Sequence, residues 1–144
     1  MICEFGNDDG ISELGFGIWC EPVTKISSFR DLRVWQQGMD LVTEIYRVSQ
    51  SFPKYEVYGL TGQMRRAAVS VPANIAEGHI RKHTKVFLNH LSIALGSLAE
   101  LQTETEVALR LGYLTTEESA SVLKQSASLA RQLHSLRNAI PKSG

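Results

Sequence analysis

The stretch that decides the fold is residues 60–77, which read LTGQMRRAAVSVPANIAE. Its larger apolar side chains recur every three or four residues, at Leu60, Met64, Ala67, Val71 and Ile75. This spacing aligns side chains in one stripe along an α-helix. Pro72 lies inside the pattern, and a proline within a helix removes a backbone hydrogen bond and kinks the helix. We therefore predict a helix from about Leu60 to Glu77 with a kink at Pro72.

A second apolar set lies on nearly the opposite side of the same helix. It comprises Val69, Ala73, Ala76 and Ile80. A helix that is apolar on two sides is typically buried on both. One side can face the helices of its own chain, and we predict that the other contacts a second copy of the protein.

Ahead of this stretch, a first helix is predicted from Asp31 to about Ser51. Its expected inward stripe is Leu32, Trp35, Met39, Val42 and Tyr46. Trp35 and Tyr46 are interpreted as core side chains, with stacking against nucleic-acid bases as the alternative. Phe52 and Pro53 end the helix, because proline disfavours helical geometry in the residue before it.

Two helices follow the deciding stretch. The third begins at Thr84, the predicted N-cap, and stops at Gly112. The fourth begins at Thr115, which forms a capping-box pattern with Glu118, and ends before Pro141. Their inward stripes are Phe87, Leu91, Ala94, Leu98, Leu101, Thr105 and Ala108, and then Val122, Leu129, Leu133, Leu136 and Ile140. Four helices with short connections predict an all-α, antiparallel, up-down-up-down four-helix bundle over residues 29–141.

The composition fits one ordinary globular domain, with 144 residues of which 43% are hydrophobic and 21% charged. The formal net charge is zero but unevenly distributed. Residues 1–28 hold five acidic residues and one lysine, a net charge of −4, so the remainder carries +4. This moderate basic bias permits binding to RNA or DNA without requiring it.

Residues 1–28 keep neither a helical nor a strand period and are predicted to be a flexible N-terminal tail. A short strand packed on the bundle, or an incorrectly assigned start site, are the alternatives. Cys3 and Cys20 match neither a redox pair nor half of a zinc site, so we interpret them as reduced thiols. The sequence has no secretory signal pattern and no run of about 20 apolar residues, which predicts a cytoplasmic location without membrane contact.

Two groups of cations are candidates for phosphate contacts. Arg65 and Arg66 point away from the inward stripe, where guanidinium groups can bind phosphates; a solvated face or a salt bridge between subunits is the alternative. Arg81, Lys82 and Lys85 follow Gly78, and His79 and His83 add titratable groups to the same connection. We predict that this second group binds nucleic acid, because several cations gather at one corner between helices.

Asn74, Glu77 and Glu100 are predicted to form a structural polar network across helices, because buried polar groups need partners. Acid-base chemistry or a metal site is the alternative for the two carboxylates. His79, His83 and His90 are interpreted as ordinary histidines rather than zinc ligands. The sequence has no phosphate-binding loop, serine nucleophile motif or dinucleotide fingerprint. We therefore predict a protein that is not an enzyme and holds no metal or cofactor.

Several of these residues together resemble a known family. They are Phe29, Leu32 and Trp35; Phe52, Pro53, Glu56, Gly59 and Leu60; residues 63–67 and 70–78; and Ala94, Gly96, Ser97, Leu98, Glu100 and Leu101. The set resembles the four-helix bundle proteins named after the 23S rRNA intervening sequence. A proline inside a helix followed by Asn-Ile-Ala-Glu-Gly is more specific than bundle packing alone would require.

The resemblance implies a bacterial cytoplasmic protein, often pentameric, encoded within inserts in ribosomal RNA genes or elsewhere, and without an established activity. A related branch contains accessory proteins of diversity-generating retroelements, which associate with a reverse transcriptase and with nucleic acid. Those proteins are more basic than this chain, and an acidic tail is not part of their pattern. The expected function is a non-enzymatic homo-oligomer that binds nucleic acid through a basic surface. The alternative is a protein-binding scaffold or accessory subunit, for example of a reverse transcriptase.

Overall fold

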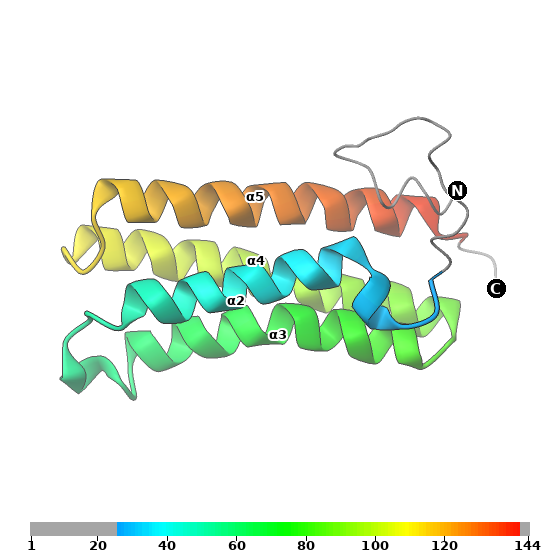
Figure 1. Ribbon diagram of the computed structural model, residues 1–144, viewed down its shortest axis with the longest axis horizontal. Coiled ribbons are helices and arrows are strands. Elements are labelled where there is room, and N and C mark those ends of the chain that lie inside the picture. The colour runs from blue at the N-terminus through cyan, green and yellow to red at the C-terminus, as the bar shows by residue number, and fades with distance from the viewer. Residues whose placement is uncertain (1–25, 142–144) are drawn as a thin grey trace.

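The computed structural model describes residues 26–141, which form an all-α bundle (Figure 1). Four long helices make up the bundle, and none of the described residues forms a strand. The elements are the 3₁₀ helix η2 (Phe29–Asp31), α2 (Arg33–Ser49), the 3₁₀ helix η3 (Lys54–Glu56), α3 (Leu60–Ile80), α4 (Thr84–Arg110) and α5 (Thr116–Ala139). The predicted fold class is confirmed.

Each helix packs against the helices before and after it in the chain, and α5 returns to pack against α2. The four helices run side by side with alternating direction (Figure 1). The start of α2, the end of α3, the start of α4 and the end of α5 therefore lie at one end of the bundle. Residues far apart in the sequence are brought together there.

Three of the predicted inward stripes are confirmed. The residues predicted for α3, α4 and α5 are buried, apart from Leu60, Phe87 and Ile140, which are partly buried and pack against the core. Hydroxyl residues of α5 that the prediction omitted, Ser119 and Ser126, are also buried.

The stripe predicted for the first helix is wrong at Met39 and Tyr46, which are 41% and 43% exposed. Leu32 is buried, and Trp35 and Val42 are partly buried against the core, as predicted. The buried residues of α2 itself are Val34, Gly38, Leu41, Ile45, Val48 and Ser49. The reason is the contact between α2 and α3. A Cβ on Gly38 would lie only 3.3 Å from Pro72 Cβ, so the two helices approach each other at a glycine that the apolar pattern ignored.

The helix ends follow local hydrogen bonding. Thr115 and Glu118 form the predicted capping box, with both bonds 3.0 Å long. Gly112 has φ +80°, a backbone conformation that favours glycine. At the other end of the bundle, Ser28 and Asp31 form a capping box for η2, so Asp31 belongs to η2 and α2 starts at Arg33.

Thr84 was predicted to cap the third helix, and this is wrong. The N-cap of α4 is His83, whose side chain makes no capping hydrogen bond, and Thr84 is the first helical residue. Lys82 adopts φ 52°, a left-handed conformation that turns the chain one residue earlier than expected and leaves His83 extended.

Most of the predicted N-terminal tail and both cysteines lie outside the described residues, which begin within the tail at residue 26. Within the part of the chain that the structure describes, no helix has the length and apolarity needed to cross a membrane.

Gly78 is buried on α3 where this helix meets α4. A Cβ added to Gly78 would lie 2.7 Å from His90 Cβ and 3.0 Å from Phe87 Cδ1. The distance to His90 Cβ is shorter than real Cβ contacts, and a Cβ cannot rotate out of the way as the tip of a flexible side chain can. The separation of α3 and α4 at this level therefore depends on a glycine.

We expect Gly78→Ala to lower the free energy of unfolding by about 1–3 kcal/mol, because overpacking pushes α3 and α4 apart. Gly96→Ala is the matched control, since Gly96 also lies in a helix but an added Cβ meets nothing within 4 Å. There alanine should raise the free energy of unfolding by about 0.5–1 kcal/mol. Urea unfolding measures both variants, and a stabilised Gly78→Ala protein would contradict the close contact.

Candidate functional site

The connection between α3 and α4 presents the predicted group of cations. Arg81, Lys82 and Lys85 are all exposed there. Arg81 forms an ion pair of 2.9 Å with Glu77, but both side chains are at least half exposed, and such surface pairs contribute little. Among the described residues Lys82 and Lys85 have no carboxylate partner. Their charges are therefore available to a ligand.

The fold adds two cations that sequence reasoning missed. Arg30 lies in η2, which packs against α3, and Arg137 lies in the last turn of α5 at the same end of the bundle (Figure 1). We call Arg30, Arg81, Lys82, Lys85 and Arg137 the basic end. The signal was present in the predicted topology, because an up-down-up-down bundle places the first residues of one helix beside the last residues of the next.

The acidic residue Asp31 lies at the same end but is already occupied. Its Oδ2 accepts hydrogen bonds from the backbone and hydroxyl of Ser27 and from the backbone of Ser28, at 3.0–3.2 Å. The Ser27 backbone bond is the main cause that lowers the pKa of Asp31. This carboxylate serves the capping box.

His79, in the last turn of α3, is half-buried. Its ring meets the Phe87 ring edge-on, with 5.9 Å between centroids. Burial, and next the charge of Lys82, lower the pKa of His79, while Asp31 opposes them. Because the ordinary value is 6.5, the imidazole is neutral at pH 7 in the free protein.

Arg65 and Arg66, the other predicted phosphate contacts, do not act together. Arg65 Nε donates to Ser49 Oγ at 2.9 Å, and its guanidinium lies 4.5 Å from the centre of the Tyr46 ring. It therefore links α3 to α2. Arg66 is exposed and interacts electrostatically with Glu104 of α4. Both lie in the first two turns of α3, away from the basic end.

The predicted polar network of Asn74, Glu77 and Glu100 is not brought together. Glu77 pairs with Arg81, and Glu100 is exposed. Asn74 instead bonds to Ser70 through Nδ2, at 2.9 and 3.0 Å, and its Oδ1 lies 2.8 Å from His90 Nδ1. Because an amide oxygen only accepts, Nδ1 of His90 carries the proton.

One further bond extends this arrangement between the same two helices. Ser70 Oγ lies 2.7 Å from Ser97 Oγ. We call Ser70, Asn74, His90 and Ser97 the polar seam of α3 and α4. It is built from short side chains, which allow the two helices to lie close together.

Glu104 continues the line of His90 and Ser97 at seven-residue spacing, and sequence reasoning missed it. Its side chain is 7% exposed, and its Oε1 has no hydrogen-bond partner among the described residues. Burial, then the nearby charge of Glu100, raise the pKa of Glu104 to about 7, and Arg66 opposes both. The carboxyl group is therefore partly protonated at neutral pH.

The second apolar set of α3 is uncovered in the single chain. Val69, Ala73 and Ile80 are exposed, and Ala76 is half-buried. We call these four residues the outer face of α3. The structure places them on the side away from the core, as the sequence predicted; contact with a second copy stays a prediction.

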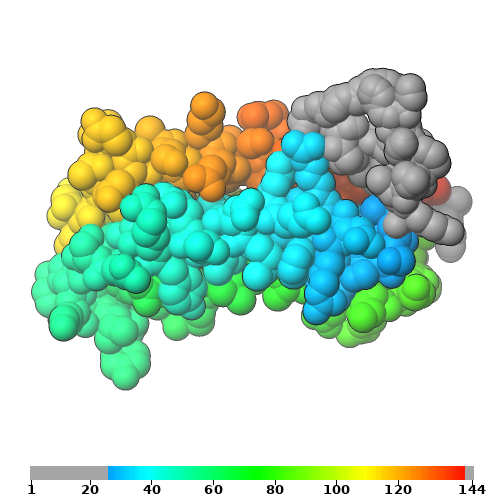
Figure 2. All heavy atoms as spheres, viewed as in Figure 1, coloured from blue at the N-terminus to red at the C-terminus, as the bar shows by residue number. Residues whose placement is uncertain are grey.

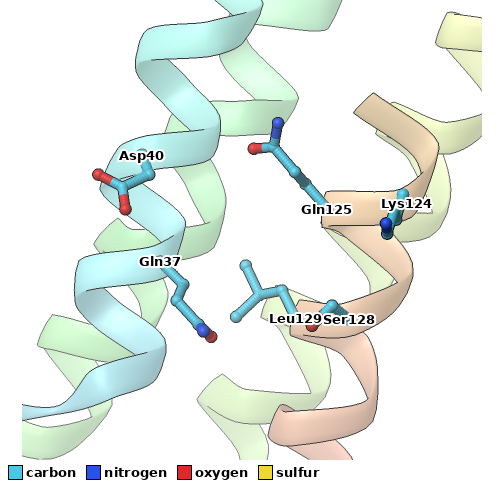
Figure 3. A pocket seen from close by; sticks show the side chains of 6 residues that line it. All are labelled: Gln37, Asp40, Lys124, Gln125, Ser128 and Leu129. Atoms are coloured by element: carbon cyan, nitrogen blue, oxygen red, sulfur yellow. The ribbon is translucent and has the colours of Figure 1, made fainter. Parts of the chain in front are cut away.

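A groove of about 310 Å³ lies between α2 and α5. It is lined by Gln37, Asp40, Lys124, Gln125, Ser128 and Leu129. In the space-filling view α2 lies across the front and α5 along the upper edge (Figure 2). Gln37 and Leu129 point toward each other across the groove, while Asp40 points away (Figure 3). The charged groups of the lining are one carboxylate, Asp40, and one ammonium group, Lys124.

The histidines do not form a metal site within residues 26–141. There is no group of three or more His, Cys, Asp or Glu side chains able to hold an ion among the described residues. His90 faces Asn74 in the polar seam, whereas His79 faces Phe87.

Two comparisons with known proteins agree with this architecture. The model of the family described as 23S rRNA-intervening sequence protein matches residues 30–135. A crystal structure of a protein of unknown function from the S23 ribosomal protein family of Bacteroides thetaiotaomicron is 24% identical, with a TM-score of 0.68. The match covers 73% of this chain and 95% of that one, and it shows the shared fold. A search of curated proteins found no match.

The buried Glu104 predicts a specific pH dependence. Because its pKa rises from 4.5 to about 7 on folding, the stability from its protonated form is present below about pH 4.5 and is lost as the pH rises through about 7. Glu104→Gln keeps the shape without the titration. We expect the variant to gain stability relative to the wild type between pH 5 and pH 8, measured by urea unfolding. A constant difference across this range would show that Glu104 is not a buried titrating group.

Proposed function

Because the chain belongs to the 23S rRNA-intervening sequence protein family, we propose that it is a non-enzymatic homo-oligomer that binds nucleic acid through its basic end. We place it in the bacterial cytoplasm. The observation that carries the proposal is the convergence of Arg30, Arg81, Lys82, Lys85 and Arg137 at one end of the bundle, from η2, the α3–α4 turn, α4 and α5. The described residues carry 13 Lys and Arg against 10 Asp and Glu, an excess of three positive charges.

The mode of binding follows from the chemistry of this end. Lysine and arginine side chains neutralise phosphates and release counterions, which supports affinity without reading sequence. The two carboxylates near the turn, Asp31 and Glu77, are occupied by a capping box and by Arg81. A polyanion can therefore reach Lys82 and Lys85 without displacing a carboxylate from either.

Assembly into an oligomer is supported by the outer face of α3. Val69 and Ile80 are large apolar side chains that the single chain leaves 42% and 60% exposed, on a helix whose opposite side is core. Covering them with a second copy buries apolar surface. A ring of five copies, as the family resemblance implies, would repeat the basic end and add its phosphate contacts together.

A second candidate function rests on the opposite end of the bundle. Tyr55, Val57, Tyr58 and Leu111 are exposed there, and Tyr58 is 94% exposed. The loop is held in place by Glu56, which accepts from Leu60 N at 3.0 Å and from the Tyr113 hydroxyl at 2.8 Å. Exposed tyrosines on a fixed loop suit a protein partner. A protein-binding scaffold or accessory subunit, for example of a reverse transcriptase, is therefore the alternative, and capture that survives nuclease and high salt would favour it.

Binding to nucleic acid should depend on both salt and the basic end. We expect the affinity for a generic RNA or DNA to fall steeply with salt. For each phosphate contact, log Kd should rise by about 0.7–0.9 per log unit of salt concentration. Changing Arg81, Lys82 and Lys85 together to glutamate should abolish retention at low salt. Filter binding over a salt series measures both effects.

A matched control separates this site from the effect of net charge. Lys54, Arg110 and Lys124 are also exposed but lie away from the basic end, and changing them to glutamate alters the total charge equally. Retention should largely persist in this control. Equal loss in both triple variants, or unchanged retention in the first, would rule out the basic end as the binding surface.

Assembly is tested with a pair of single substitutions at equal exposure. Val69 on α3 and Met39 on α2 are 42% and 41% exposed. Val69→Glu should give smaller particles in light scattering, because a charge would enter the subunit contact without a partner. Met39→Glu should leave the mass unchanged. The same mass for both variants would exclude the outer face of α3 as the contact.

A further inference from the structure

A pocket of about 290 Å³ lies where α3 turns into α4. Three segments of the chain form its walls: residues 78, 79, 82–84 and 87 around the turn, Ile26 and Ser27 before η2, and Ile140 after α5. The turn from α3 to α4 and the end of α5, which contribute to this lining, lie at the right-hand end of the molecule in Figure 1, as does the basic end. The sequence predicted the basic residues of this turn as a surface patch, but it did not predict a pocket.

The titratable side chains that line the pocket are all basic. Lys82, His79 and His83 contribute an ammonium group and two imidazoles, and no carboxylate lines the pocket among the described residues. Asp31, near enough to affect His79, has its Oδ2 bound by Ser27 and Ser28. A lining with one lysine, two imidazoles that can donate hydrogen bonds and no carboxylate favours an anion.

The rest of the lining is mixed. Phe87, Ile26 and Ile140 contribute apolar surface, and Ser27 and Thr84 contribute hydroxyl groups. The volume is near the lower end of the range for small-ligand sites, roughly 300 Å³. A phosphate group and an attached sugar or base are of this size, which a bare inorganic ion is not.

We propose that this pocket binds a terminal phosphate monoester of a nucleic-acid strand, with Lys82, His79 and His83 on the phosphate and Phe87 against the nucleoside. A terminal monoester carries a charge of about −1.5 to −2 at pH 7, whereas a phosphate within a strand carries about −1. The proposal rests on the proposed function for its macromolecular ligand and adds to it a preference for strand ends.

The direct test compares one oligonucleotide in three versions, with hydroxyl ends, a 5′-phosphate or a 3′-phosphate, on the full chain. We expect one phosphorylated version to bind about tenfold more tightly or better, as for a charge-assisted contact. Lys82→Asn should remove this gain, and asparagine tolerates the left-handed backbone at this position. Lys85→Asn, outside the lining, should weaken all three versions equally and keep the gain.

A second measurement reports on the pocket itself. The pKa of the His79 imidazole, followed by NMR, should rise when a nucleoside monophosphate binds, because the anion stabilises the charged ring. The same nucleoside without phosphate should leave it unchanged. If Lys82 had only a structural role, Lys82→Asn would change neither the tighter binding of the phosphorylated oligonucleotide nor the response of the His79 pKa to the monophosphate.

The outcomes separate this proposal from the broader one. Equal affinity for all three oligonucleotides, or a His79 resonance that no phosphate moves, overturns the pocket while nucleic-acid binding stands. A His79 response to the monophosphate, lost in Lys82→Asn, without retention of any oligonucleotide, supports a phosphate site and overturns the nucleic-acid function.

Discussion

The close approach of α3 and α4 is the constraint on which the rest of the structure depends. Gly78 leaves no room for a Cβ against His90. Beside it, the polar seam joins the two helices through hydrogen bonds between two serines and between an asparagine and a histidine. On its other side, α3 meets α2 where Gly38 lies against Pro72. Close contacts at two glycines therefore set the position of α3 against α2 and against α4.

This placement of α3 has two consequences for function. With two sides fixed, its third side carries Val69 and Ile80 into solvent, where the chain itself offers no cover. The short turn from Ile80 to Thr84 then leaves Arg81 and Lys82 exposed beside the pocket. One helix therefore supports both the proposed subunit contact and the proposed phosphate contacts. The buried Glu104 of α4, which the charge of Arg66 on α3 affects, adds a group with a pKa of about 7.

The sequence predicted the elements of this fold well, because repeated apolar spacing and capping patterns are local signals. The stripes of α3, α4 and α5 and the box of Thr115 and Glu118 depend only on residues near each other in the chain. The stripe of the first helix was wrong at Met39 and Tyr46, because α2 holds two apolar sets and a glycine contact with another helix decides between them. Local pattern contains no information on such contacts.

The candidate sites were harder to predict for the same reason. The cations of the α3–α4 turn are adjacent in sequence, whereas Arg30 and Arg137 join them only through the topology. Arg65 is bound to Ser49 on another helix, and Asn74 found His90 rather than the expected carboxylates. Glu104 was missed because the residues next to it in the sequence do not indicate that its charged side chain is buried.

In the proposed assembly, the outer face of α3 joins copies of this chain, and their basic ends bind nucleic acid. Light scattering of the purified protein on a sizing column, recorded with absorbance at 260 and 280 nm, tests both properties at once. We expect a nuclease-sensitive peak whose protein mass is a multiple of 16.0 kDa and whose 260/280 ratio exceeds that of protein alone. A single 16.0 kDa species with the absorbance of pure protein would contradict it.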